Sequence, residues 1–431
     1  MNTGAGISPT DYDLIVIGGG ASGLIAAGRA AELGARVLVL EKNRRPGRKL
    51  LISGGGRCNV TNAEADIHRL VARYGSEGKA LYSVFAGFTP ADMIGFLHRF
   101  GVATKVEAEQ RAFPADDRAE SVLRALLIFA ANAEIRCSTP VATVSTGNHG
   151  EARFRVETAS GHRYGARWVL IATGGYARPD TGSTGDGFGW LKTMGHTIIV
   201  PEPILVPIRV KERWCADLMG LSFSECGLAA RRADEPPAFR AVGKLLFTHF
   251  GLSGPLVLNR SAEIDALARG GRPLQIELDF FPAMDGGALE RKLLDICERS
   301  PRRQVAAVLG ELVPPRLAAL VASRAEVDPA LRAAEVSRAA RKAMVAQLKA
   351  LVLTYAGRLG NDKAIVSRGG VPVDEVNFKT MESRIVPGLL LAGDVLDLDR
   401  PSGGYSLQIC WSTGWRCGET AANTEESCAG E

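Results

Sequence analysis

Three glycines near the N-terminus, Gly18, Gly20 and Gly23, have the spacing G-x-G-x-x-G. In such a turn the first glycine bends the chain, the second leaves room for a diphosphate, and the third lets a helix pack on the preceding strand. Glu41 follows Gly23 by eighteen positions, near the place of an acid that hydrogen-bonds a ribose. The spacing therefore predicts a dinucleotide site, and the alternative is a glycine-rich turn without a ligand.

The sequence around this turn predicts the elements that would position it. Residues 14–17 and 36–40 are short, largely apolar stretches, as expected for parallel strands buried on both faces. Alanines at 26, 27, 30 and 31 predict a slim helix between the strands, and Gly34 suits the end of that helix. Its N-terminus would offer N–H groups and a positive partial charge to a diphosphate.

A second stretch with chemical potential is residues 42–62, where basic side chains lead into the triple glycine 54–56 and a polar run. Bare backbone amides beside arginines form concave anion sites. Glycine and asparagine are equally typical of mobile surface loops. Composition alone does not decide between an anion-binding loop and a mobile surface loop.

The composition is that of an ordinary globular protein. The 431 residues carry 52 basic and 47 acidic side chains, which gives a net charge of +5. This mild excess does not indicate a basic tail that binds nucleic acid. The eight cysteines form no C-x-x-C pair, so we expect no metal site and free thiols in a reducing cytoplasm. Residues 1–12 do not resemble a signal peptide, and no apolar run reaches membrane-spanning length.

The segments Gly47-Arg-Lys and Ser53-Gly-Gly-Gly-Arg-Cys-Asn-Val-Thr-Asn62 resemble the signature of the BaiN-type flavoproteins, also called the aminoacetone-oxidase family. The similarity returns at residues 111–114, 173–176 and 246–255 and near the C-terminus, so it spans nearly the whole chain. It implies noncovalent FAD and a fold of the glutathione-reductase and fumarate-reductase class. The stretch 42–62 would then pass along the flavin.

The resemblance also gives roles to later residues. The strand that ends at Gly393-Asp394 resembles the one whose aspartate hydrogen-bonds the ribityl chain in FAD enzymes. It implies that the last helix, from Ile409, begins under the flavin pyrimidine, and that Val141 offers backbone groups to adenine. Asp186 resembles a residue beside the flavin, although its position before a helix favours a capping role instead.

The G-x-G-x-x-G turn and the resemblance together predict one set of cofactor contacts. The predicted residues are Gly18, Gly20, Ala21, Ser22, Gly23, Glu41, Lys42, Arg48, Lys49, Leu50, Ser53, Gly54, Gly55, Arg57, Cys58, Asn59, Val141, Thr173, Gly174, Gly175, Asp186, Gly393, Asp394, Gly404, Tyr405 and Leu407.

We expect an α/β fold in which an inserted domain interrupts a Rossmann-like FAD-binding domain with a parallel sheet. Residues 1–200 and 355–431 would form that domain. Short strands predict a β-barrel-like domain over 201–285, and alanine-rich helical periodicity predicts a helical subdomain over 286–354. This insertion shows no alternating βαβ pattern for a second dinucleotide.

No catalytic acid or base stands out. His249 lies in a family-like segment and would serve as an acid or base, or simply pack. Cys58 is a redox thiol or a buried, inert cysteine. Arg111 faces a substrate anion or solvent. Because Asp394 ends a strand, we expect its truncation to leave the fold intact.

These observations favour an FAD-dependent oxidoreductase that acts on a small organic substrate, with NAD(P)H as a transient donor or oxygen as the redox partner. Two alternatives remain, a flavoprotein that modifies RNA and a flavin-bound sensor. Aromatic residues make up only 6% of the chain, which disfavours an RNA-stacking surface, so we expect no nucleic-acid or membrane partner.

Overall fold

The computed structural model describes residues 11–423 apart from 148–151, 233–234, 270, 272 and 361. Residues 1–10, which bear on the signal-peptide expectation, and Cys428 lie outside the described residues. The chain divides into two compact units, residues 1–203 with 361–431, and Ile204–Gly360. From the sequence we predict these domain boundaries between residues 200 and 201 and between residues 354 and 355.

The first unit is built on a mostly parallel sheet. Strand β1 (Tyr12–Ile17) lies between β2 (Val37–Leu40) and β9 (Arg163–Ile171) and is parallel to both. The sheet continues to β20 (Leu389–Leu391) on one side and β6 (Glu134–Arg136) on the other. Leu14, Ile15 and Val16 are fully buried, because both faces of the sheet are covered. The expected Rossmann-like α/β fold is confirmed.

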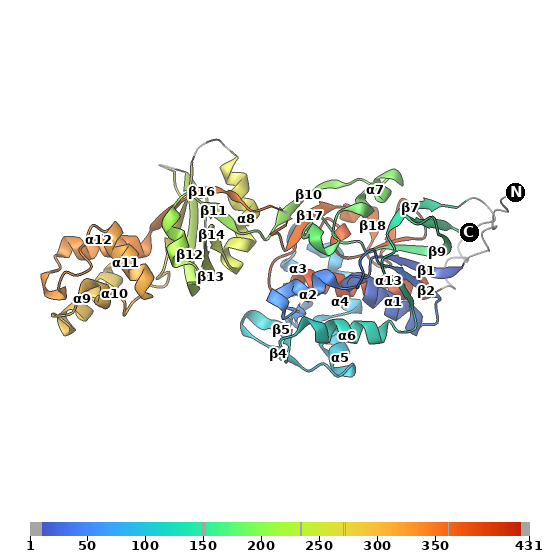
Figure 1. Cartoon of the computed structure of the whole chain (residues 1–431), viewed down its shortest axis with the longest axis horizontal. Helices are drawn as coiled ribbons and strands as arrows, with labels where there is room; N and C mark the ends of the chain where they lie inside the picture. The colour runs from blue at the N-terminus through green and yellow to red at the C-terminus, as the bar shows by residue number, and fades with distance from the viewer. Residues whose placement is uncertain are drawn as a thin grey trace. The chain divides into compact units, whose positions relative to one another are not determined.

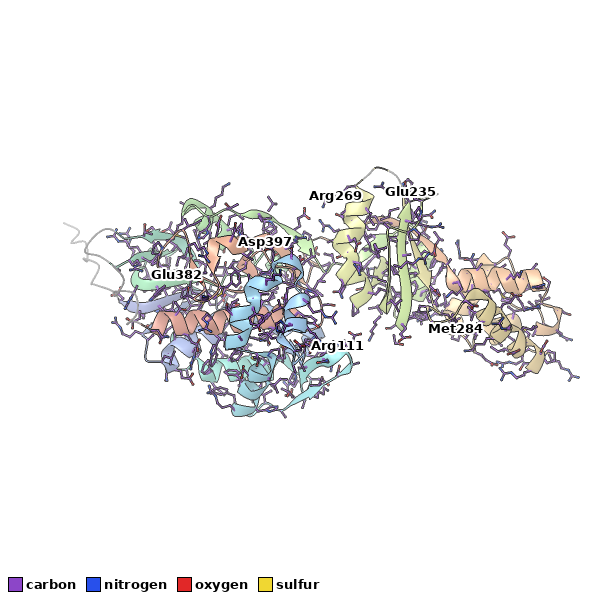
Figure 2. All side chains as sticks on the ribbon, turned by 180° about the vertical axis from the view of Figure 1, so that it is seen from behind. Arg111, Glu235, Arg269, Met284, Glu382 and Asp397 are labelled. Atoms are coloured by element: carbon purple, nitrogen blue, oxygen red, sulfur yellow. The ribbon has the colours of Figure 1, made fainter. Side chains whose placement is uncertain are left out.

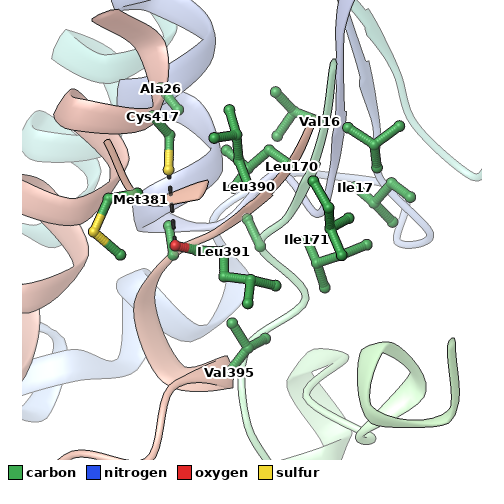
Figure 3. Packing of buried hydrophobic residues seen from close by; sticks show 14 of the residues in the cluster. Val16, Ile17, Ala26, Leu170, Ile171, Met381, Leu390, Leu391, Val395 and Cys417 are labelled. Atoms are coloured by element: carbon green, nitrogen blue, oxygen red, sulfur yellow. Dashed lines mark hydrogen bonds between the residues drawn. The ribbon is translucent and has the colours of Figure 1, made fainter. Parts of the chain in front are cut away.

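The two ends of the chain meet in two helices that lie side by side, α1 (Ala21–Glu32) and α13 (Tyr405–Ala422) (Figure 1). Their backbones approach closely because α13 has glycine at the contact: a Cβ on Gly414 would lie 2.4 Å from Ser22 O. Figure 3 shows Cys417 of α13 donating a hydrogen bond to Leu391 O of β20 over 3.8 Å. The C-terminal helix is therefore part of the N-terminal nucleotide unit.

Strand β9 takes part in two kinds of pairing. Its first half pairs antiparallel with β8 (Phe154–Thr158), and its second half runs parallel to β1. β8 in turn pairs with β7 (Val141–Thr146).

The remaining elements of the first unit lie between and around these strands. They are α2 (Arg48–Ile52), β3 (Thr61–Asn62), α3 (Ile67–Ala72), η2 (Gly75–Leu81), α4 (Tyr82–Gly87), α5 (Pro90–Arg99), β4 (Thr104–Val106), β5 (Arg111–Pro114), α6 (Ala119–Phe129), α7 (Asp186–Thr193), β10 (Ile199–Ile204), β17 (Val366–Gly370), β18 (Val376–Asn377), β19 (Glu382–Ser383) and η8 (Gly393–Val395).

One stretch, Gly75–Arg99, is long and apolar enough to cross a membrane by composition, with 44% of its window buried. This differs from the expectation that no apolar run reaches membrane-spanning length. In the structure it is not one helix, because Phe88 is extended and Thr89 caps α5 with a capping box. Val84, Phe85 and Leu97 lie in hydrophobic cores, and a core helix of a globular protein passes the same test.

The second unit contains a closed antiparallel barrel. Its strands are β11 (Ile208–Val210), β14 (Gly251–Ser253), β13 (Phe239–Thr248), β12 (Ser222–Arg232), β15 (Leu274–Asp279) and β16 (Leu351–Arg358), in spatial order. The last strand follows the helices in sequence, and the barrel also carries α8 (Pro255–Ala268), a helix that the sequence analysis missed.

Four helices follow β15, namely α9 (Gly286–Arg299), α10 (Val305–Leu309), α11 (Pro315–Arg324) and α12 (Arg338–Lys349) (Figure 1). Leu293 and Leu348 from these helices share one hydrophobic core with barrel residues such as Ile276. Barrel and helices therefore form a single packed body.

Candidate dinucleotide site

In the turn between β1 and α1, Gly23 is closely surrounded by protein atoms, whereas Gly20 faces open space. A Cβ on Gly23 would lie 1.9 Å from Gly18 O, so only glycine allows this helix to start so close to the strand. A Cβ on Gly20 would meet no protein atom within 4 Å, and its φ of −85° suits any residue. No side chain caps α1, so Ala21 and Ser22 begin a helix whose first N–H groups are available to an anion.

Glu41 is buried, with 6% exposure, beside this turn. One carboxylate oxygen accepts the N–H of Gly19 at 2.8 Å, and the other accepts the N–H and Nδ2 of Asn43 at 2.7 Å each. Glu41 thus fixes the glycine turn and also lies where a ribose acid is expected. Asn43 was missed, although its position two residues after Glu41 is typical of a side chain that bonds to local backbone.

Asp394 lies between two cations from distant parts of the chain. Its Oδ2 accepts a hydrogen bond from Lys49 Nζ at 2.9 Å, and its Oδ1 lies 3.2 Å from Arg400 Nε. Burial of the carboxyl opposes its ionisation, but Lys49 and Arg400 outweigh burial and hold the pKa of Asp394 below its ordinary value. One negative and two positive charges leave the cluster net positive.

Arg400, which the sequence analysis missed, has a fully buried side chain. Its guanidinium donates to the carbonyls of Leu396 and Leu398 at 2.7 and 2.9 Å. It also donates to Gly393 O at 3.1 Å and Ser367 O at 3.3 Å. Arg400 therefore ties together the loop that carries Asp394.

The basic and glycine-rich stretch is a folded loop. Lys49 and the buried Leu50 lie on α2, and Arg48 donates to Asn43 Oδ1 at 3.1 Å. Ser53 donates to Leu50 O at 2.7 Å. The glycines 54, 55 and 56 all have left-handed φ values, from 56° to 88°, which side chains rarely adopt.

Two predicted contacts in this loop are engaged elsewhere. The Arg57 guanidinium forms ion pairs with Glu107 and Asp117 and lies 4.1 Å from the centre of the Phe113 ring. Cys58 is fully buried, and burial raises the pKa of its thiol to about 12. The structure therefore favours the inert interpretation of Cys58.

The start of α13 is held against the same loop. With its amide oriented to satisfy both ends, Asn59 Oδ1 accepts the N–H of Gly404 at 2.9 Å. Tyr74 donates to Tyr405 O at 2.9 Å, and Leu407 packs against the core that contains Leu50. Among the described residues no side chain caps α13, so its first N–H groups have no side-chain acceptor.

The segment after β9 forms another part of the site. Thr173 Oγ1 is buried without a hydrogen-bond partner among the described residues. A Cβ on Gly174 would lie 2.8 Å from Ser183 Oγ, and one on Gly175 would lie 2.3 Å from Ser367 Oγ.

Asp186, nearby, pairs with Lys42 at 2.7 Å. It is the first residue of α7, and Gly185 occupies the cap position without a side-chain bond, so the predicted capping role is wrong.

Three further candidates remain, two in the first unit and one in the second. Val141 begins β7 and pairs with Thr158. Arg111, labelled in Figure 2, donates to Ala108 O at 3.0 Å. His249 is exposed in the second unit, with its ring 4.8 Å from that of Phe250.

The residues fit a dinucleotide with hydroxyl groups. Thr173 Oγ1 and Asp394 Oδ1 are buried polar atoms without a well-directed partner in the described chain, and Gly20 faces open space. Two uncapped helix starts suit a diphosphate or a reduced ring. Among the described residues, no group of three His, Cys, Asp or Glu side chains is arranged for a metal ion.

Comparison with known proteins identifies the chain. Residues 12–420 match the family model described as the HI0933-like protein Rossmann domain. The chain belongs to this HI0933-like family. It is an FAD-dependent oxidoreductase, as the resemblance to BaiN-type flavoproteins implied, and the sensor alternative loses its support.

Two relatives are 30% identical to this family member. One is a 3-dehydro-bile acid delta(4,6)-reductase of Clostridium scindens, with 94% of this chain and 98% of the relative covered. The other is a ribosomal RNA dihydrouridine synthase of Escherichia coli, with 95% and 97% covered. A 3-ketosteroid-delta4-(5alpha)-dehydrogenase from Rhodococcus jostii shares the fold, with a TM-score of 0.56, 15% identity, and 97% and 98% covered.

We predict that Gly20→Val gives a folded, colourless protein. A Cβ at this position meets no protein atom within 4 Å, so a valine there should project into the space assigned to the FAD diphosphate. Flavin content after purification and thermal stability of the apoprotein measure the two effects. Gly95→Val, at an exposed helical glycine that also faces open space, is the control and should stay yellow. Full FAD occupancy in the Gly20 variant would contradict the assignment.

The structure changes the expectation for Asp394. Its truncation leaves Lys49 and the buried Arg400 unpaired, so Asp394→Ala should lower the free energy of unfolding by about 3–5 kcal/mol besides weakening FAD. Urea unfolding of the apoprotein measures this loss. Asp180→Ala, which breaks an exposed pair with Arg178, should cost less than about 1 kcal/mol. Equal losses in both variants would show that the Asp394 cluster contributes little.

The same cluster predicts a pH dependence. Because the pKa of Asp394 is lowered in the folded state, its stabilisation is present above the unfolded-state pKa, about 3.9, and is lost as the pH falls through the folded-state pKa. The difference in unfolding free energy between the wild type and Asp394→Asn should be constant from about pH 5 to 7 and shrink below about pH 4. A difference that grows on acidification would reverse this sign.

Proposed function

We propose that this enzyme adds two hydrogens across a carbon–carbon double bond that is conjugated to a carbonyl group. One observation carries the proposal: two relatives of equal identity, similar over nearly their full length, have names that denote this one reaction on very different molecules. A 3-oxo bile acid with unsaturation at positions 4 and 6 and a uracil ring both contain the unit C=C–C=O. The shared chemistry is therefore a better guide than either substrate.

When bound, FAD supplies the hydride chemistry. The chain would hold it through the open turn at Gly20, through Glu41 at the ribose and through Asp394 at the hydroxyl-bearing chain. Of the two partners of Asp394 among the described residues, Lys49 is the partly exposed one, at 27%, so the carboxylate could bind both Lys49 and a ligand. The net positive cluster and the uncapped start of α13 would favour the negative charge of the reduced ring.

The proposed donor is NAD(P)H. Overall, NAD(P)H and one proton would saturate the double bond and yield NAD(P)⁺, which balances atoms and electrons. The second unit is an antiparallel barrel with helices rather than a βαβ unit, which supports a donor that uses the substrate position transiently instead of a second nucleotide domain.

A uracil within RNA is a second candidate substrate. The sequence analysis expects no nucleic-acid partner, but the name of the Escherichia coli relative reopens the RNA alternative. The net charge of +5 on the helical residues 286–354 favours this RNA alternative.

The reaction class is tested by anaerobic flavin photometry. The purified protein, bleached with NADPH, should regain its oxidised flavin band on addition of a conjugated enone or of uridine-containing RNA. A saturated ketone is the matched control and should leave the flavin reduced. Reoxidation by disulfides or oxygen, with none by any conjugated double bond, would refute the proposal.

The single-position donor model predicts ping-pong kinetics. Rates measured against NADPH at several fixed acceptor concentrations should give parallel double-reciprocal lines, because the donor product leaves before the acceptor binds. Intersecting lines, with NADP⁺ binding to the oxidised enzyme unaffected by acceptor, would show a separate nicotinamide site.

A further inference from the structure

The positive charge of the protein is concentrated in its helical insertion. Residues 286–354 contain 12 basic and 7 acidic side chains, a net charge of +5. The rest of the chain then has 52 − 12 = 40 basic and 47 − 7 = 40 acidic side chains, a net charge of zero. The whole excess of positive charge is therefore carried by 69 of the 431 residues.

Most of these cations face solvent. The exposed basic residues are Arg291, Lys292, Arg299, Arg302, Arg303, Arg316, Arg324, Arg332, Arg338 and Lys342. The helices that present them share one packed core, because α9, α11 and α12 bury Leu293, Leu317 and Leu348 together.

Four arginines, Arg299, Arg302, Arg303 and Arg332, form what we term the basic corner. Two segments distant in sequence meet there: Ala333 N donates to Arg303 O at 2.8 Å and Ala334 N donates to Pro301 O at 3.1 Å. Arg303 pairs with Glu311. Within the described part of the chain, no carboxylate lies within 4.0 Å of the guanidinium of Arg299, Arg302 or Arg332.

The same surface offers little to an apolar partner. Residues 286–354 contain no Phe, Trp or Tyr, and none of the exposed large hydrophobic side chains in the described chain lies among them. A membrane-surface helix needs apolar side chains to insert, and a base-stacking surface needs aromatic rings. Arginine without either is suited to phosphate groups, which its planar fork binds through two hydrogen bonds.

We propose that the helical part of the insertion docks RNA by its phosphate backbone, with the basic corner as a principal contact. The inference rests on the uridine-reducing form of the proposed function, since docking would hold a large substrate whose sequence the surface does not read. Contacts to phosphate position a nucleic acid without specifying its bases. Base selection would then fall to the flavin site.

The test compares binding of bulk ribosomal RNA by the FAD-loaded wild type and by the triple variant Arg299→Gln/Arg302→Gln/Arg332→Gln, using filter binding over a range of salt concentrations. Each lost phosphate contact should reduce the slope of log affinity against log salt by about 0.7–0.9. We expect a slope shallower by roughly 2, and binding weaker by at least about tenfold at 0.15 M salt.

Arg69→Gln/Arg124→Gln/Arg163→Gln, which removes three exposed arginines from the first unit, makes the same change in net charge and should bind RNA nearly as tightly as the wild type. Equal loss in both triple variants, or no loss in either, would overturn the proposal. So would tighter binding to vesicles of anionic lipid than to RNA. The rate at which NADPH reduces the flavin should be unchanged in both triple variants.

The two proposals fail in distinguishable ways. If RNA binding depends on the basic corner but no uridine is reduced, the docking surface stands and the uridine-reducing function falls. If uridines in RNA are reduced equally by the wild type and the basic-corner variant at 0.15 M salt, the function stands and the docking surface falls.

Discussion

The nucleotide unit depends on a buried carboxylate that needs two cations. A buried charge is tolerated only when it is paired, and Asp394 is paired with Lys49 from α2 and with Arg400 from the loop that follows η8. Arg400 follows Asp394 closely in sequence, whereas Lys49 precedes it by 345 positions, with the whole insertion between them. The Lys49 pair therefore requires α2, which follows the glycine turn, to lie beside the loop after β20. One electrostatic contact thus joins distant parts of the chain at the candidate site.

The parts of this unit that were predictable from sequence are those encoded locally. The predicted strand at 14–17, the helix with its alanines and the predicted strand at 36–40 follow one another without interruption, so periodicity and glycine spacing define them. Arg400 had no such signal. Its burial results from four carbonyls that surround it only in the folded loop, and in sequence it resembles a solvated arginine between an aspartate and a proline.

Three expectations were drawn from position in sequence, and long-range ion pairs bear on each of them. Asp186 was expected to cap α7, but its carboxylate pairs with Lys42, and the described residues place no side-chain cap on that helix. Arg57 lies in the loop that resembles a flavin signature, and its guanidinium pairs with Glu107 and Asp117, so its contact with the cofactor stays a prediction. Asp394 was expected to tolerate truncation as a strand-end residue, whereas its pairing with Lys49 and Arg400 now predicts a loss of stability.

Charge and chemistry are separated along this chain. Under the proposed function, a steroid and a uracil present the same conjugated unit to the flavin, so the flavin site by itself would discriminate weakly between them. A net charge of +5, taken over all 431 residues, suggested no polyanionic partner, but all of this excess charge is confined to residues 286–354, where it gives a stronger local field. The rest of the chain, with equal numbers of basic and acidic residues, carries no net charge that would select an apolar or a polyanionic substrate. On this proposal the surface charge of the helices would select between the two classes.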